Sequence, residues 1–484
     1  MPDCEGAKRS MLFNSIDFAV FLPVVFTLYW FVLDRGLKVR NLLIVVASYL
    51  FYGWWDWRFL FLIALSTVID YSIGLALGSE ERPGKRKLLL WASLLANLGI
   101  LGFFKYYNFF LDNFISAFSF FGSELNVRML DIILPVGISF YTFQTLSYTI
   151  DVYKRKMEPT RDFMAFAAFV SFFPQLVAGP IEKASHLLPQ FFKKRAFDYD
   201  FAVSGVRFII WGLFKKMVIA DNAAIIVDGI FTGYESQSSL SLIVGAILFA
   251  FQIYCDFSGY SDIAIGTGRL FGFDLMTNFR FPYLSPNISE FWKRWHISLS
   301  TWFRDYVYIP LGGSRISQAV ALRNITVVFL VSGFWHGANW TFIVWGGIHA
   351  MLYIPVFMRR KNTDTLATTD NAIKNLSKVL LNFIIVTLAW VYFRSDSVGM
   401  ANDYLVRLFM GGGEKAYFLI STKYKLITAI SFASIGLLLF IEYFSFRRQK
   451  KEVLLSSPVL LILCLLIMFL GALKNHANFI YFQF

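Results

Sequence analysis

Two histidines in unusual surroundings are the side chains of this sequence best suited to chemistry. The chain contains only five histidines, and His336 lies inside an apolar run from Ile325 to Trp345. Burial disfavours a charged imidazolium, so a histidine in this setting is held neutral and can accept a proton. Such a residue is suited to act as a general base, for example on a hydroxyl group. The alternative is a structural histidine that hydrogen-bonds across two helices.

The second histidine lies in an aromatic and basic stretch. His296 is forty residues upstream of His336, within residues 291–300. Asn287 followed by Glu290 predicts the start of a helix. The aromatic residues between 292 and 306 recur at helical spacing, which predicts one helix at the membrane interface or a re-entrant helix. From the residues alone, the alternative to a functional role is that His296 is an interfacial histidine on an aromatic face.

The run that contains His336 predicts a helix break. Residues 323–358 are too many for one span of about 20 residues and too few for two spans with a loop. The natural break is Gly337-Ala338-Asn339. We therefore expect His336 at a helix end, where Asn339 and freed backbone N–H groups can stabilise an oxyanion. His349, thirteen residues further on, is interpreted as structural.

Two further polar stretches interrupt apolar runs. Residues 172–181 contain two prolines and a glycine, which predicts either a kink or a non-helical piece that lines a cavity. Residues 252–262 contain Asp256 and Asp262, which must face protein or water because ionised carboxylates are costly in lipid. They form either a catalytic pair or a structural pair that holds helix ends or binds Arg or Lys side chains.

Composition places the chain in the membrane. It is 57% hydrophobic and only 16% charged, with 55 Phe, 23 Tyr and 13 Trp among 484 residues. The apolar segments predict an all-α polytopic protein with about 11 transmembrane helices plus re-entrant helices. The net charge of +13 comes from short basic loops between apolar segments, so nucleic acid is not an expected partner. Three widely spaced cysteines predict neither a disulfide nor a metal site.

The basic loops also predict orientation. Residues 34–40 and 79–87 carry an excess of Lys and Arg and are separated by two spans, so both should be cytoplasmic. The N-terminus is then extracytoplasmic, and no cleavable signal peptide is expected. Residues 1–10 are polar and are interpreted as a possible extension without structural role. Residues 11–484 are predicted to form one membrane-embedded domain.

Several of these stretches together resemble the membrane-bound O-acyltransferase (MBOAT) family. They are residues 13–18, 172–181, 252–262, 291–310 and 333–340. The resemblance is to the bacterial branch of alginate O-acetylation proteins and teichoic acid D-alanyl transfer proteins. It covers residues 11–394, whereas residues 395–484 match less and are expected to carry substrate or partner specificity. It implies helices around a central tunnel, with His336 as the catalytic residue and His296 as the second family histidine.

The resemblance implies an O-acyltransferase in the inner membrane of a bacterium. An acyl group, expected to be acetyl, would pass from a cytoplasmic thioester such as acetyl-CoA toward hydroxyls of a cell-envelope or extracellular polysaccharide. A secreted or periplasmic acyltransferase is a possible partner beside membrane lipid, and no bound cofactor or metal is expected. The alternatives are a lipid or protein acyltransferase, a transporter and a non-catalytic scaffold. Further candidates for donor or substrate binding are Lys293, Arg294, Arg304, Asp305, Trp335 and Asn339.

Overall fold

The computed structural model divides the chain into two compact units. Unit 1 comprises the described parts of Met1–Ile209 and Ile263–Met276, and unit 2 comprises the described parts of Ile210–Asp262 and Thr277–Phe484. The predicted N-terminal extension, residues 1–10, lies outside the described residues. The structure describes residues 11–32, 36–122, 127–177, 179–359, 372–449, 452–453, 455–472 and 479–480.

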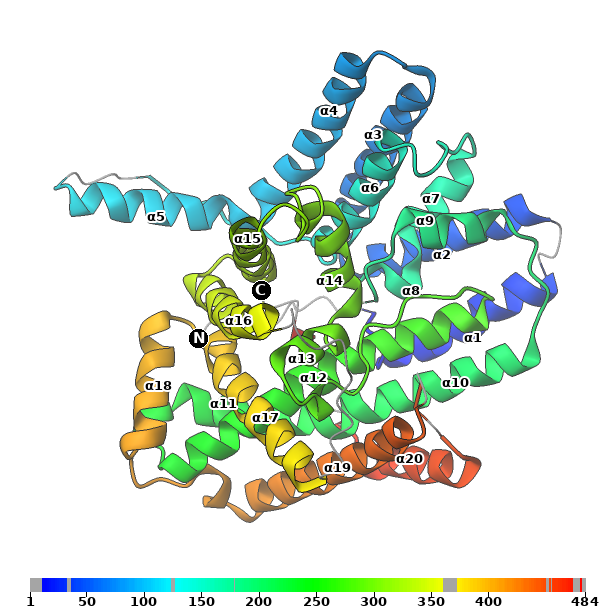
Figure 1. Cartoon of the computed structure of the whole chain (residues 1–484). Coiled ribbons are helices and arrows are strands. Elements are labelled where there is room, and N and C mark those ends of the chain that lie inside the picture. Colours follow the sequence, from blue (N-terminus) through cyan, green and yellow to red (C-terminus); the bar gives the residue numbers. More distant parts are fainter. Residues whose placement is uncertain are drawn as a thin grey trace. The chain divides into compact units, whose positions relative to one another are not determined.

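Helices make up nearly all regular structure in the described residues, with a single isolated bridge between Gln237 and Lys415 (Figure 1). The first part of the chain forms α1 (Ile16–Thr27), α2 (Leu37–Asp56), α3 (Leu60–Ser79), α4 (Pro83–Leu101), α5 (Tyr107–Phe120), α6 (Ile138–Tyr153), α7 (Phe163–Ser171), α8 (Phe173–Leu176), α9 (Ala184–Leu187) and α10 (Tyr199–Leu213). The rest forms α11 (Asp221–Thr232), α12 (Ser239–Leu270), α13 (Ile288–Arg294), α14 (Ile297–Phe303), α15 (Gln318–His336), α16 (Trp340–Arg359), α17 (Ala372–Arg394), α18 (Val398–Met410), α19 (Thr422–Arg447) and α20 (Ser457–Leu470).

Short π-helical and 3-10 helical segments join or extend these helices. The π-helical turns are η1 (Leu28–Val32), η3 (Gly102–Tyr106), η5 (Phe214–Ala220) and η8 (Arg304–Tyr308). The 3-10 turns are η2 (Trp57–Phe59), η4 (Leu188–Phe192), η6 (Tyr234–Ser236), η7 (Pro282–Leu284) and η10 (Tyr417–Leu419).

Seven helical segments of the described chain are long and apolar enough to cross a membrane, which confirms the prediction of an all-α polytopic protein. One of them, Leu37–Ser79, has 43 residues and contains both α2 and α3. Each of those helices has 20 residues, which is enough for one span. Three shorter apolar helical segments add to the seven: Ile16–Val32, Phe163–Leu176 and Ser457–Leu470. The number of about 11 spans stays a prediction.

Within unit 1, a buried carboxylate joins three helices. Asp70 of α3 accepts hydrogen bonds from Ser93 and Asn97 of α4, at 2.5 and 2.8 Å, and from Thr149 of α6, at 2.8 Å. Interhelical hydrogen bonds of this kind hold helices together where lipid offers no hydrophobic driving force. The helix break predicted in residues 172–181 is also confirmed, because α7 ends at Ser171 and only the short α8 follows.

The second polar stretch, residues 252–262, lies inside α12, which runs unbroken through it. Its two carboxylates are neutralised by adjacent lysines of η5. Lys215 lies 2.5 Å from Asp262, and Lys216 lies 2.7 Å from Asp256. A helix can carry ionised residues at depth when each is paired inside the protein, so the polar residues required no break in the backbone. The structural alternative, pairing with basic side chains, describes the observed contacts.

In unit 2, α15 and α16 lie side by side (Figure 1). Glycines at their contact allow the two helices to pack closely. A Cβ atom added at Gly333 would lie 2.2 Å from the carbonyl oxygen of Phe342, and one at Gly346 would lie 2.4 Å from that of Phe329. Small residues allow helix backbones to approach in this way in membranes. The crossing fixes the end of α15, where His336 is located.

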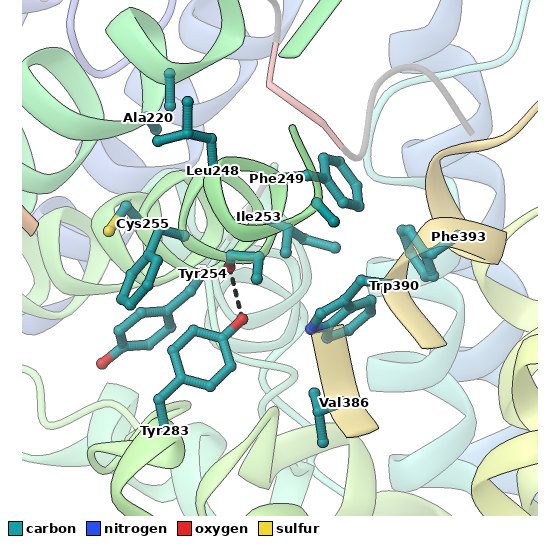
Figure 2. Packing of buried hydrophobic residues seen from close by; sticks show 14 of the residues in the cluster. Ala220, Leu248, Phe249, Ile253, Tyr254, Cys255, Tyr283, Val386, Trp390 and Phe393 are labelled. Atoms are coloured by element: carbon teal, nitrogen blue, oxygen red, sulfur yellow. Dashed lines mark hydrogen bonds between the residues drawn. The ribbon is translucent and has the colours of Figure 1, made fainter. Parts of the chain in front are cut away.

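Aromatic side chains fill the core of unit 2 (Figure 2). The Tyr283 hydroxyl donates a hydrogen bond to the carbonyl oxygen of Ala250 in α12, at 2.6 Å. Trp390 and Phe393 of α17 belong to the same buried cluster, with ring centroids 5.2 Å apart. Buried rings of this size dominate the packing energy of a core. The core therefore holds α12 and α17 beside the elements that carry the histidines.

We expect Gly346→Ala to lower the unfolding temperature of the purified protein in detergent, whereas Gly347→Ala in the same helix leaves it nearly unchanged. The added methyl group at Gly346 would collide with the backbone of Phe329, but at Gly347 it would meet only Leu330 Cδ2 at 3.8 Å. Overpacking of a tight contact costs about 1–3 kcal/mol. Equal unfolding temperatures for the two variants would show that this crossing is not tight.

Candidate active site

His336 lies at the predicted helix break, which the structure confirms. It is the last residue of α15, Gly337 is extended with φ −162°, and α16 begins at Trp340. The His336 side chain is almost completely buried, with an exposed fraction of 2%. Its ring centroid lies 5.0 Å from that of Trp335, 5.4 Å from Trp345 and 5.3 Å from Phe393. The imidazole is thus enclosed by aromatic rings on α15, α16 and α17.

Asn339 fixes the connection between these helices. Its Oδ1 accepts a hydrogen bond from the Thr341 N–H at 3.0 Å, which caps the first turn of α16. Its Nδ2 donates to the carbonyl oxygen of Asp396, just beyond the end of α17, at 2.9 Å. Asn339 therefore holds the break beside His336 in one position. One of its two amide N–H groups is used for this purpose.

His296 lies at a break that was not predicted. The helix start at Asn287 is confirmed, because its side chain accepts the Glu290 N–H at 2.9 Å. The single helix predicted through residues 292–306 is wrong, since α13 ends at Arg294 and α14 begins at Ile297. His296 between them adopts the left-handed conformation, with φ 44°.

The backbone that precedes η7 explains this second break. The N–H of Arg280 donates to the carbonyl oxygen of Arg294 at 3.0 Å, and the N–H of Ile297 donates to that of Asn278 at 2.9 Å. These bonds satisfy groups that a continuous helix would have used internally. A left-handed residue other than glycine costs about 1–2 kcal/mol, and such strain concentrates at functional sites. The break turns His296 away from the helical register that its sequence predicts.

The His296 side chain is fully buried, with an exposed fraction of 0%. Its Nδ1 lies 3.3 Å from Oδ1 of Asn278, and its ring centroid is 4.6 Å from that of Phe257 on α12. Burial lowers the pKa of His296 to about 3. The imidazole is therefore neutral near pH 7, with one nitrogen able to accept a proton or a hydrogen bond.

The structure brings the two predicted histidines together. The ring centroids of His296 and His336 are 6.2 Å apart, and that of Trp335 is 6.0 Å from His296. Two buried imidazoles at this separation can both reach groups of one bound substrate. Such a pair can take a proton from a hydroxyl with one ring and orient the reacting group with the other. The Trp335 ring adjoins both histidines, with its centroid 5.0 Å from that of His336 and 6.0 Å from that of His296.

The two basic candidates for donor binding, Lys293 and Arg294, both contact the carboxylate of Glu290. Lys293 Nζ lies 2.7 Å from Glu290, and Arg294 lies 3.5 Å from the same carboxylate. Lys293 is half exposed, whereas the Arg294 guanidinium lies 5.0 Å above the ring of Phe446. Arg294 is thereby anchored by both charge and a ring face.

The remaining candidate residues each contact another side chain in the described structure. Arg304 is largely exposed and pairs with the neighbouring Asp305 at 2.7 Å. His349 accepts a hydrogen bond at Nδ1 from Trp292 Nε1 at 3.3 Å, as a structural histidine would. Among the residues that the structure describes, no group of three His, Cys, Asp or Glu side chains could hold a metal ion. Cys255 and Cys464 are free thiols, and Cys4 lies outside the described residues.

Sequence reasoning named Asp256 and Asp262 but missed their partners Lys215 and Lys216. Lys216 contacts both Asp221, at 2.8 Å, and Asp256, at 2.7 Å. The Asp256 carboxylate also accepts the backbone N–H of Ile480, at 2.7 Å. Two adjacent lysines inside an apolar run indicate buried acidic partners, so this pattern was the sequence signal that could have identified them.

Near its C-terminus the chain returns to this region. The Phe479 ring lies 4.4 Å from Tyr260 and 6.0 Å from Phe257, the residue that contacts His296. No sequence pattern links an aromatic residue more than 200 positions away to α12. The described end of the chain therefore contributes to the surroundings of the second histidine.

The fold and the site define a multi-pass helical membrane protein with two buried histidines whose ring centroids lie 6.2 Å apart. Comparison with known proteins gives the family. Residues 158–394 match the model of the membrane-bound O-acyltransferase family, MBOAT. The chain belongs to the MBOAT family, and it is therefore an O-acyltransferase.

Three relatives show the range of similarity. The chain is 42% identical over 395 residues to the probable alginate O-acetylase AlgI of Pseudomonas putida, covering 81% of this chain and 79% of the relative. It is 38% identical over 424 residues to a peptidoglycan O-acetyltransferase of Helicobacter pylori, covering 81% and 78%. It is 29% identical over 231 residues to a teichoic acid D-alanyltransferase of Bacillus subtilis, covering 45% and 57%.

The buried His296 predicts a pH-dependent stability. Because its folded pKa of about 3 lies below the ordinary 6.5, the unfolded chain binds a proton between these values and the folded chain does not. Folded-state stability is therefore lost as pH falls below 6.5, by up to about 1.4 kcal/mol per pH unit from this residue. His296→Gln removes this contribution.

The measurement is the unfolding temperature in detergent at several pH values from 7.5 down to 4.5. We expect the unfolding temperature of His296→Gln to fall less steeply than that of the wild type. Each protein's own value at pH 7.5 serves as its reference, which removes any general destabilisation by the substitution. Parallel curves for the two proteins would mean that folding does not lower the pKa of His296.

Proposed function

We propose that the protein transfers an acyl group, acetyl in the simplest case, from a cytoplasmic thioester to hydroxyl groups of a polysaccharide outside the cytoplasm. The observation that carries the proposal is the pair of buried histidines, with ring centroids 6.2 Å apart, in a chain of the MBOAT family. The relatives that the chain matches over most of their length are named for O-acetylation of alginate and peptidoglycan. Both are cell-surface polysaccharides.

In the proposed reaction, His336 acts as the general base. It takes the proton of the acceptor hydroxyl while the hydroxyl oxygen attacks the thioester carbonyl carbon. The tetrahedral intermediate then collapses, the carbon–sulfur bond breaks, and the proton passes from His336 to the leaving thiolate. The developing oxyanion needs N–H donors, and the second amide N–H of Asn339 is the candidate beside the helix break.

His296 is proposed to orient the acyl donor. As a neutral imidazole it offers one N–H and one acceptor nitrogen without introducing a charge. The aromatic rings of Trp335, Trp345 and Phe393 around His336 keep bulk water from the reacting carbonyl. Water would otherwise hydrolyse the thioester in competition with transfer.

The donor is proposed to enter from the cytoplasmic side along α13. Lys293 and Arg294 directly precede the break at His296, and their charges suit the phosphates of acetyl-CoA. Arg304, Asp305 and Trp335 are secondary candidates for the same path. The basic loop at residues 79–87 would then be cytoplasmic and the N-terminus extracytoplasmic, in the inner membrane of a bacterium. A secreted acyltransferase that completes delivery to the polysaccharide is part of the proposal.

His336→Gln should lower acyl transfer by about 10²–10⁴-fold, the range that a general base contributes. The assay follows radiolabelled acetyl from acetyl-CoA into polysaccharide in membrane vesicles that contain the protein, with the periplasmic fraction of the source bacterium added so that the proposed secreted acyltransferase is present. His349→Gln is the matched control, a buried histidine on the next helix, and it should retain activity. Wild-type transfer by a folded His336→Gln protein would favour a scaffold that acts through another enzyme.

Lys293→Ala should raise the KM for acetyl-CoA by about two- to fivefold, as expected for a partly exposed ion pair with a phosphate. Glu290→Gln is the matched control with the opposite expected effect. It removes the carboxylate that Lys293 and Arg294 share, so both basic side chains become available to the donor and the KM for acetyl-CoA should fall. Added salt should weaken the wild type more than Lys293→Ala. If neither substitution changes the KM, these side chains only anchor α13 to anionic lipid.

A further inference from the structure

Asn278 lies in the segment between α12 and η7, beside the break that carries His296. It is completely buried, with an exposed fraction of 0%, and it belongs to unit 2 together with His296, Ser298 and Ser261. A buried amide must satisfy its donors and its acceptor oxygen inside the protein, because a hydrogen bond left unmade there costs free energy. No step of the acyl transfer proposed for the two histidines uses this side chain.

Three hydrogen bonds fix the amide of Asn278 in one orientation. Its Oδ1 accepts the backbone N–H of Ser298 at 3.3 Å and the Ser298 hydroxyl at 2.6 Å. Its Nδ2 donates to Ser261 Oγ of α12 at 3.1 Å. A backbone N–H can only donate, so the atom of the amide that faces it must be the oxygen. Turning the amide over would place two N–H donors against each other.

This orientation decides which nitrogen of His296 carries the proton. The same Oδ1 of Asn278 lies 3.3 Å from His296 Nδ1. A carbonyl oxygen attracts an N–H group but repels the lone pair of a bare ring nitrogen, so the neutral imidazole is more stable with its proton on Nδ1. The other ring nitrogen, Nε2, then carries the lone pair and acts as a hydrogen-bond acceptor.

The backbone of Asn278 holds the same break. Its carbonyl oxygen accepts the N–H of Ile297 at 2.9 Å, next to His296 in its left-handed conformation with φ 44°. Phe257 of α12 meets the imidazole edge on, with an angle of 82° between the ring planes. A strained conformation persists only where several partners over-determine it. Asn278 therefore contributes both to the place of the imidazole and to the place of its proton.

We propose that Asn278 is a positioning residue that keeps the proton of His296 on Nδ1, so that His296 presents Nε2 to the acyl donor as a hydrogen-bond acceptor. The inference rests on the proposed function for the role of His296, whereas the tautomer itself requires no catalysis. An acceptor nitrogen can hold only a group that carries an N–H or an O–H. In acetyl-CoA, the groups of this kind nearest to the thioester are the amide N–H groups of the pantetheine arm.

The tautomer is measured by ¹⁵N NMR of the purified full-length protein in lipid bilayers at pH 7.5, with labelled histidine and no substrate. The chain has five histidines, and the signals of His296 are those that His296→Gln removes. Protonated and bare ring nitrogens differ in chemical shift, and couplings within the ring distinguish Nδ1 from Nε2. We expect the proton of wild-type His296 on Nδ1. A proton on Nε2 in the wild type would contradict the proposal without any variant.

Two substitutions at Asn278 test whether its oxygen sets this tautomer. Asn278→Leu is similar in size but offers no acceptor, so the Nδ1–H signal of His296 should be lost to the Nε2–H form. Asn278→Asp keeps an acceptor oxygen and should keep the proton on Nδ1. Asn382→Leu is the matched control, because it removes another buried asparagine of unit 2, which donates to the carbonyl oxygen of Ser285 at 3.0 Å, and it should leave the spectrum unchanged. An intact Nδ1–H signal in folded Asn278→Leu, or its loss in Asn278→Asp, would refute the assigned role.

Acetyl-CoA added without an acceptor tests the part of the proposal that concerns the donor. At saturation it should shift the Nε2 signal of wild-type His296 and leave the proton on Nδ1, because only Nε2 gains a hydrogen bond. In the transfer assay, Asn278→Leu should raise the KM for acetyl-CoA about three- to tenfold, the factor that one hydrogen bond is worth, and change kcat less than about twofold. Asn382→Leu should change neither. An Nε2 signal that stays in place at saturation, or a fall in kcat at constant KM, would rule out the donor as the partner of Nε2.

The outcomes separate this inference from the proposed function. If Asn278 sets the tautomer of His296 but His336→Gln transfers acetyl like the wild type, the proposed mechanism fails and the positioning role stands. If transfer depends on His336 while His296 carries its proton on Nε2, the reaction stands and the role of Asn278 is wrong.

Discussion

The pairing of charges inside an apolar protein is the constraint on which the rest of unit 2 depends. Lys215 and Lys216 lie in consecutive positions of η5, and each is within 2.8 Å of a carboxylate on α12, with Asp221 of α11 as a further partner of Lys216. Removing one partner of a buried pair leaves an uncompensated charge, which typically costs about 3–5 kcal/mol. These pairs fix α12 against η5 and allow it to run unbroken. Phe257, which follows Asp256 in α12, is thereby placed against the ring of His296.

The two histidines are presented by helix breaks of different origin. At His336 the chain must turn between two helices that cross tightly, and Asn339 caps the second of them. At His296 the chain leaves the helix because the backbone of Asn278 and Arg280 offers alternative hydrogen bonds. In both places backbone groups at depth are satisfied by specific partners, as a bilayer environment demands. In a continuous helix, each imidazole would lie on the helix face that its sequence position dictates. The break moves each imidazole off that face.

These origins explain how much could be predicted from the sequence. The start at Asn287 and the break after His336 depend on local signals, namely a capping residue and the length of an apolar run, and both predictions are confirmed. The break at His296 depends on residues 278–280, and the continuity of α12 depends on lysines some forty positions upstream. Such distant partners leave no trace in local periodicity. Both histidines could be proposed as functional residues from the sequence. That their ring centroids lie 6.2 Å apart could be learned only from the tertiary structure.

The position of the proposed base depends on contacts beyond the helix that carries it. Aromatic rings on three helices surround His336 and exclude bulk water from its imidazole. Asn339, just after the break, caps α16 and also donates a hydrogen bond to the carbonyl oxygen of Asp396, beyond the end of α17. Arg394, the last residue of α17, pairs in turn with Asp228 of α11 at 2.8 Å. Because these contacts tie the break to the ends of α17 and to α11, the placement of His336 is fixed by several helices and not by the packing of α15 on α16 alone.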